Sequence, residues 1–166
     1  MNTKDNVIEI VDKLYKQNHV HPIKKTMQKI VYLIQNKGCD LGYDYDIHFY
    51  GPYSSDLDYD LQTLNRDDQL LIEYTSMGHK ISVQDKAVYD LSNNNIIDEV
   101  IVKYGGKTPF DLELIATTLF VQRNLETGDE SQIIQGVKKL KGEKYAEKQI
   151  KEAFENLEEN AFLNCI

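Results

Sequence analysis

Three aspartates, Asp56, Asp58 and Asp60, occupy the first two turns of a helix predicted to begin near Ser54 or Ser55. Carboxylates in a first helical turn are stabilised by the helix dipole, by about 0.3–1 kcal/mol each. This effect accounts for Asp56 and Asp58 without any functional role. Asp60 lies beyond the first turn and needs another explanation.

The charge of this helix argues against a role in reading DNA. Residues 54–68 contain five acidic residues and one arginine, which gives a net charge of −4. Proteins contact the phosphates of DNA mainly through lysine and arginine, and an acidic recognition helix would be repelled. The sequence therefore favours a solvent-exposed or protein-binding face for this helix.

Other residue patterns in the chain fall short of known catalytic or metal-binding motifs. His19 and His21 lack the further ligands that a metal site needs. Residues 104–108, YGGKT, lack the first glycine of a phosphate-binding loop and follow a predicted helix instead of a strand. Ser54 is outside a nucleophile elbow, and Cys39 has no recognisable base with an orienting group. We predict no catalytic, cofactor-binding or metal-binding residue, and an unrecognised enzyme is only a second alternative.

Aromatic residues are dense around the start of the acidic helix. Core packing explains such a cluster, but a partner surface does so too, because a tyrosine has an apolar body and a polar end. Both interpretations stay open at this point. The residues are Tyr43, Tyr45, Phe49, Tyr50, Tyr53 and Tyr59.

Positive charge is concentrated in the first two predicted helices. The segment from Lys13 to Cys39 has six lysines and no acidic residue, although the whole chain has a net charge of −8. Helical periodicity places Lys24, Lys25 and Lys29 off the apolar stripe of the second helix, toward solvent. An acidic partner would therefore meet this part of the chain.

Two sets of candidate contact residues follow from these patterns. The predicted partner surface consists of Lys24, Lys25, Lys29, Tyr50, Tyr53, Asp56 and Asp60. The alternative, a set of nucleic-acid contacts, consists of Lys24, Lys25, Lys29, His79 and Lys80.

Hydrophobic periodicity predicts a mostly helical chain with a small β component, in the α+β class. In residues 1–85 the pattern predicts helix, helix, strand, helix and hairpin, an arrangement like a winged helix. Residues 86–166 show helical periodicity alone, so we expect packed C-terminal helices and one domain with two lobes. The predicted helices are 5–17, 23–36, one from Ser54 or Ser55, one ending at Tyr104, one from Thr108, 129–141 and 143–159, and the predicted strands are 43–50 and two within 70–83.

Gly51 and Pro52 are predicted to turn the chain from the strand of residues 43–50 into the acidic helix. Ser54 or Ser55 would then cap that helix, because serine accepts hydrogen bonds from the first free backbone N–H groups. Leu57, Leu61 and Leu64 repeat at helical spacing and would face the core. The predicted end of the strand and the predicted cap of the helix both depend on this turn.

Length and composition describe an ordinary globular chain of 166 residues. It has no apolar run near the roughly 18 residues of a membrane span, and its start mixes charges without an apolar signal core. Its two cysteines, Cys39 and Cys165, lie far apart and are expected to be reduced. We therefore expect a cytoplasmic protein that does not contact membranes.

The segment HPIKKTMQKIVYLIQNKG and the later YDIHFYGPYSSDLDYDLQTL together resemble the YwgA-like bacterial proteins, and are more distantly similar to the Panacea (SocA-like antitoxin) domain. The resemblance covers roughly residues 20–85. It rests on a lysine-led helix, an aromatic-Gly-Pro turn and a leucine helix. The matching residues are Lys24 or Lys25, Lys29, Tyr32, Gln35, Tyr50, Gly51, Pro52, Leu57, Leu61 and Leu64. Tyr53 and Ser54, after Gly-Pro, follow the YwgA-like form, whereas Panacea domains usually have an aliphatic residue there.

The resemblance implies a helical, winged-helix-like bacterial or phage domain without known catalysis. Panacea domains neutralise toxins through protein contacts, one member is an adaptor to a protease, and members are often described as transcriptional regulators. We therefore predict a non-enzymatic regulatory domain, antitoxin-like or adaptor-like, that needs no cofactor. Its expected partner is another protein, such as a toxin, and a homo-oligomer is compatible with the sequence. The alternative is a winged-helix transcriptional regulator that binds DNA, which the net charge disfavours.

Overall fold

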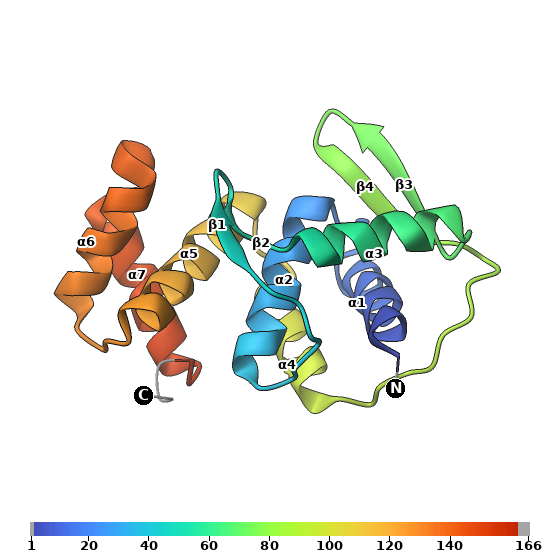
Figure 1. Ribbon diagram of the computed structural model, residues 1–166, viewed down its shortest axis with the longest axis horizontal. Coiled ribbons are helices and arrows are strands. Elements are labelled where there is room, and N and C mark those ends of the chain that lie inside the picture. The colour runs from blue at the N-terminus through green and yellow to red at the C-terminus, as the bar shows by residue number, and fades with distance from the viewer. Residues whose placement is uncertain (1, 163–166) are drawn as a thin grey trace.

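The computed structural model describes residues 2–162 and is mostly helical, with two small antiparallel hairpins (Figure 1). This confirms the predicted fold class. The elements are α1 (Thr3–Asn18), α2 (Lys24–Lys37), β1 (Asp46–His48), β2 (Gly51–Tyr53), α3 (Ser55–Arg66), β3 (Leu70–Thr75), β4 (Gly78–Val83), α4 (Asn95–Tyr104), α5 (Pro109–Leu125), α6 (Glu130–Lys141), the 3₁₀ turn η1 (Gly142–Lys144) and α7 (Glu147–Glu159).

The order of the first half is helix, helix, hairpin, helix and hairpin, which agrees with the prediction except that a second strand, β2, follows β1. Strands β3 and β4 form a two-stranded hairpin that projects beyond α3 in Figure 1, while β3 packs against α3. The extended residue Ile23, just before α2, forms an antiparallel bridge with Lys80 of β4. In the same contact, the Ile81 N–H donates to the Pro22 carbonyl at 2.8 Å. The hairpin is thereby tied to the start of α2.

The strand predicted over residues 43–50 is wrong in its extent and in its turn. Strand β1 covers only Asp46–His48, and it pairs with Gly51–Tyr53, which is itself a strand. Phe49 and Tyr50 make the turn, while Gly51 and Pro52 are buried. A proline is tolerated here because this two-stranded hairpin leaves the outer side of β2 without a strand partner.

Helix α3 begins as predicted, with Ser54 as its N-cap. The Ser54 hydroxyl oxygen accepts from the Leu57 N–H at 3.3 Å, so Ser54, and not Ser55, is the capping residue. Leu57, Leu61 and Leu64 are buried, as their spacing predicts. Asp60 accepts a hydrogen bond at 2.8 Å from the hydroxyl of buried Tyr43, which gives this aspartate a structural role.

The second half is helical, as predicted, and α5 is its central element. Helix α5 begins with Thr108 as N-cap and Pro109 in its first turn, and it packs against α2, α6 and α7. Helix α7 starts at Glu147, not at residue 143, because Gly142, with φ of +56°, ends α6 and the 3₁₀ turn η1 intervenes.

The buried side chains form a single hydrophobic cluster that includes residues from α1 through α7. Helix α4, which follows the long connection after β4, packs against both α1 and α2. In Figure 1, helices α5, α6 and α7 lie on one side of α2, and the β3–β4 hairpin lies on the other. The division into two lobes at about residue 85 stays a prediction.

Candidate functional site

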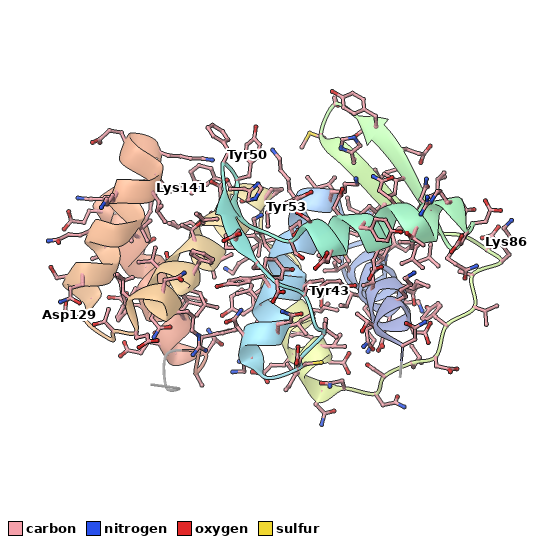
Figure 2. All side chains as sticks on the ribbon, in the orientation of Figure 1. Tyr43, Tyr50, Tyr53, Lys86, Asp129 and Lys141 are labelled. Carbon is pink, nitrogen blue, oxygen red and sulfur yellow. The ribbon has the colours of Figure 1, made fainter. Side chains whose placement is uncertain are left out.

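The turn of the β1–β2 hairpin presents two aromatic side chains to solvent. We call Phe49 and Tyr50 the hairpin tip; their side chains are 81% and 46% exposed. The two rings meet edge to face, with centroids 4.9 Å apart. In Figure 2, Tyr50 lies at the free end of the hairpin, at the same end of the molecule as Lys141 of α6. A single exposed apolar side chain is common on protein surfaces, but two adjacent exposed aromatic rings form a small apolar patch, and aromatic residues are enriched at protein interfaces.

Side chains from α2 and α6 hold the hairpin in place. The Lys29 ammonium donates to the Pro52 carbonyl at 2.8 Å, and the Lys141 ammonium donates to the Phe49 carbonyl at 2.8 Å. The Gln28 amide donates to the Ser54 carbonyl at 2.9 Å and accepts from the Ser54 N–H at 2.8 Å. Because these bonds reach backbone atoms in the turn and in the segment after it, the hairpin tip is fixed relative to the helices.

An ion cluster lies under the hairpin and is centred on Glu113 of α5. Its carboxylate accepts from Lys141 at 2.7 Å and from Lys144 at 2.8 Å. The side chains of Glu113 and Lys141 are 6% and 5% exposed, and that of Lys144 is 34% exposed. Burial raises the pKa of Glu113, but the hydrogen bonds from the two lysines outweigh burial and hold this pKa below its ordinary value. The carboxylate is therefore ionised at neutral pH.

Lys29 is buried, contrary to the prediction that it faces solvent with Lys24 and Lys25. Its residue is 3% exposed, because the β1–β2 hairpin and α5 cover this face of α2. Burial lowers the pKa of the Lys29 ammonium to about 8; Glu113 partly offsets this, while Lys141 and Lys25 add to it. Periodicity misassigned Lys29 because it recognises only the apolar stripe of α2 and not a second covered face.

The cations around Tyr50 complete the site. The Lys25 ammonium lies 3.5 Å from the centroid of the Tyr50 ring, and the Lys144 ammonium lies 5.6 Å from it. Both distances are within the range of cation–π attraction. Tyr50 is thus held between a cation from α2 and a cation from the turn after α6. Sequence reasoning missed Lys141, Lys144 and Glu113, because charged residues in amphipathic helices are normally solvent-exposed.

A cavity of about 240 Å³ opens beside the hairpin tip. We call it the tip cavity, and it brings together five of the seven residues of the predicted partner surface. The residues that line it are Lys24, Lys25, Gln28, Lys29, His48, Phe49, Tyr50, Gly51, Tyr53 and Asp58.

The other two predicted residues, Asp56 and Asp60, are outside the lining of the tip cavity. Asp60 is engaged by Tyr43, and its carboxylate also lies 3.8 Å from the Lys4 ammonium. Asp56 is exposed on the first turn of α3, where the helix dipole favours it. Of the predicted partner surface, only the lysines and tyrosines line the tip cavity, and the two aspartates lie outside it.

The residues of the alternative, nucleic-acid set are mostly engaged within the protein. Lys24 pairs with Asp58 at 2.9 Å, and Lys80 pairs with Glu73 at 3.0 Å. His79 packs edge to face against Tyr74, and Lys29 is buried. Among residues 2–162, Lys25 is the lysine of this set that is exposed without an ion pair. Such a set offers little charge to a phosphate backbone.

A larger apolar groove, of about 560 Å³, lies between the β3–β4 hairpin and the start of α5. Its lining includes Val20, Ile23, Met77 and Pro109; Val20 and Met77 are 68% and 76% exposed. Phe110, next to Pro109, is linked to the hairpin tip through Lys144, whose ammonium lies 6.0 Å from the Phe110 ring. Sequence reasoning did not identify this groove, because its residues come from three stretches far apart along the chain, within 14–26, 75–80 and 105–109.

No protein-family model matches the chain, and a search of curated proteins found no significant match. Within residues 2–162, no group of three or more His, Cys, Asp or Glu side chains is arranged to hold a metal ion. No helix in that range is both long and apolar enough to cross a membrane. Cys39 is a free, buried thiol, and Cys165 lies outside the described residues.

Proposed function

We propose that this protein is a non-enzymatic regulatory domain that binds another protein through the hairpin tip. The observation that carries the proposal is the 81% exposure of Phe49 on a turn whose backbone is held by buried lysines. Protein interfaces are dominated by a few aromatic or arginine residues, and a rigid aromatic loses little entropy on binding. Phe49 and Tyr50 have this combination of exposure and fixed position.

The charge around the tip indicates the chemistry of the partner. Three lysines, Lys29, Lys141 and Lys144, interact with one buried carboxylate, Glu113, and a fourth lysine, Lys25, lies over the ring of Tyr50. The chain has a net charge of −8, so its surface as a whole repels anions. The lysines around the hairpin tip instead favour an anionic partner. A partner segment that is acidic and also offers an apolar contact for Phe49 would complement it. By the resemblance described above, an antitoxin-like or adaptor-like role, with a toxin or protease component as partner, is the biological setting that we propose.

The DNA-binding alternative receives less support from the same geometry. Helix α3 carries Asp56 and Asp58 in its first turn, and its cation, Arg66, lies in the last turn. Hydrogen bonds and ion pairs already occupy Lys24 and Lys80. We expect duplex DNA to bind no more tightly than the roughly 10⁻⁶ M of non-specific association at physiological salt.

The test compares two exposed aromatic residues. Phe49→Ala removes one ring of the hairpin tip, and Tyr59→Ala removes a ring that is 65% exposed on α3 and is not part of the cavity lining. Each variant would be used to capture proteins from a lysate of the native host, with quantitative mass spectrometry. We expect one protein to be retained by the wild type and by Tyr59→Ala, and lost with Phe49→Ala. Equal retention by all three forms, or specific capture of DNA in place of protein, would refute the proposal.

A further inference from the structure

We propose that the tip cavity binds a carboxylate of the partner, a glutamate or aspartate side chain, between Lys25 and Lys29. The inference rests on the proposed function for the source of this carboxylate. The contact between this carboxylate and the two lysines would form when Phe49 inserts into the partner's surface.

The first argument is the uncompensated charge of the cavity wall. Asp58 is the acidic residue of the lining, and it already pairs with Lys24 at 2.9 Å. Glu113, the nearest buried carboxylate, is bound by Lys141 and Lys144. Within residues 2–162, neither Lys25 nor Lys29 forms an ion pair. The cavity is therefore lined by two cations whose charge no protein carboxylate directly balances.

The second argument is the incomplete hydrogen bonding of Lys29. An ammonium group has three N–H donors. The structure gives Lys29 one hydrogen-bond acceptor, the Pro52 carbonyl at 2.8 Å. A buried charge with unused donors is unfavourable, and a carboxylate that enters the cavity would accept from it and offset its desolvation. The lowered pKa of Lys29, caused by burial, is consistent with this shortage of compensating charge.

The third argument is the size and shape of the cavity. Its volume of about 240 Å³ is below the roughly 300–1,000 Å³ that is usual for small-molecule sites. It equals the liquid volume of about eight water molecules, enough for a carboxylate with a short methylene chain. Phe49, Tyr50 and Tyr53 provide apolar walls for those methylenes. One acidic side chain fits these dimensions better than a nucleotide or other metabolite.

Several other titratable or charged groups lie around the same site. They are Lys25 of α2, Asp58 of α3, His48 of β1, Tyr53 of β2, Glu113 of α5, Lys141 of α6 and Lys144 of η1. Of these, Glu113 favours the charged form of Lys29, whereas Lys141 and Lys25 oppose it. A bound carboxylate adds a second favourable charge, so it should raise the pKa of Lys29 from about 8 toward its ordinary 10.5. By linkage, carboxylate binding should weaken as pH rises above 8.

The experiment measures the pKa of Lys29 in the full chain by NMR, from the pH dependence of its ¹³Cε shift. N-acetyl-glutamate amide is the probe, N-acetyl-glutamine amide is its uncharged control, and inorganic phosphate is a third arm at equal ionic strength. We expect the glutamate probe to raise the pKa of Lys29 by about one unit or more, equivalent to a tenfold preference for the charged form. The glutamine control should leave it unchanged.

Variants at exposed residues test whether the pKa shift of Lys29 arises from binding in the tip cavity. Lys25→Gln alters an exposed residue and should reduce the shift caused by the glutamate probe, whereas Lys16→Gln, on the exposed side of α1, should not. No shift with the glutamate probe, the same shift with the glutamine control, or a shift with phosphate alone would each overturn the carboxylate assignment. A shift of Lys29 without capture of any protein by the hairpin tip would instead refute only the proposed function.

Discussion

Replacement of Glu113 by glutamine tests the buried ion cluster that supports the hairpin. Glutamine keeps the shape of the side chain and an oxygen acceptor, but it removes the negative charge. Lys141 is 5% exposed and is held by the Phe49 carbonyl, so it cannot turn into water without moving the hairpin. Lys29, whose charge Glu113 favours, is also buried.

The expected loss follows from the burial of each partner. Removal of one member of a buried ion pair usually costs about 3–5 kcal/mol, because the other charge stays buried and unpaired. Lys144 is 34% exposed and can be rehydrated, and the glutamine oxygen can still accept one hydrogen bond. We therefore expect Glu113→Gln to lower the free energy of unfolding by about 3 kcal/mol, at the low end of that range. This is a large part of the 5–15 kcal/mol typical of a domain.

The assay is urea denaturation followed by circular dichroism at neutral pH, with the midpoint and slope fitted for each form. Glu147→Gln is the matched control, because Glu147 pairs with Lys138 at 2.5 Å on the exposed surface. Its midpoint should equal that of the wild type, since exposed ion pairs contribute little. The double variant Glu113→Gln, Lys141→Met should recover part of the lost stability by removal of the stranded cation. A loss below about 1 kcal/mol for Glu113→Gln would show that the cluster behaves as an exposed pair, against our reasoning.

Three further predictions concern the hairpin and its surroundings. The pKa of Lys29 is about 8 in the folded protein and 10.5 ordinarily, so between these pH values the unfolded chain binds more protons than the folded one. The free energy of unfolding should therefore rise from pH 8 to pH 10. Lys29→Met should reduce that rise, measured by urea titrations at several pH values. Ser54→Ala should cost about 1 kcal/mol in the same assay, through loss of the cap, whereas Ser55→Ala should be silent; equal effects would contradict the assigned cap. Gly51→Ala should destabilise the protein more than Gly42→Ala: both positions have positive φ, but a Cβ at Gly51 would lie 3.0 Å from the Thr117 hydroxyl, whereas a Cβ at Gly42 meets no atom within 4 Å.

Local features of this protein could be predicted from the sequence because each depends on residues only a few positions apart. The Ser54 cap bonds a residue three positions later, and Thr108 caps α5 across the same separation. The apolar stripes of α1, α2 and α3 repeat at the helical period, so one face of each helix could be assigned to the core. These signals were enough to predict the fold class and the seven helices of residues 2–162, but not strand β2 or the 3₁₀ turn η1.

The prediction was least accurate at residues 43–53, where local signals pointed the wrong way. Gly-Pro is a frequent turn dipeptide, yet here Gly51 and Pro52 form a strand and the aromatic pair before them makes the turn. The hairpin adopts this register because α2 and α5 pack on it: Lys29 binds the Pro52 carbonyl, and a Cβ at Gly51 would lie only 3.0 Å from the Thr117 hydroxyl. Neither constraint is visible within the segment.

The sequence by itself placed Lys24, Lys25, Lys29, Tyr50 and Tyr53 among the candidate contacts, since their types and their local charge suggest recognition. Only the tertiary structure decided that Lys29 is buried, that Glu113 and Lys141 support the same hairpin, and that the five candidates border one cavity. Burial and ion pairing depend on which segments pack together. The bond from Lys141 to the Phe49 carbonyl joins residues 92 positions apart. Periodicity is a property of neighbours along the chain, whereas the energy of a buried charge is set by neighbours in space, which only the folded chain brings together.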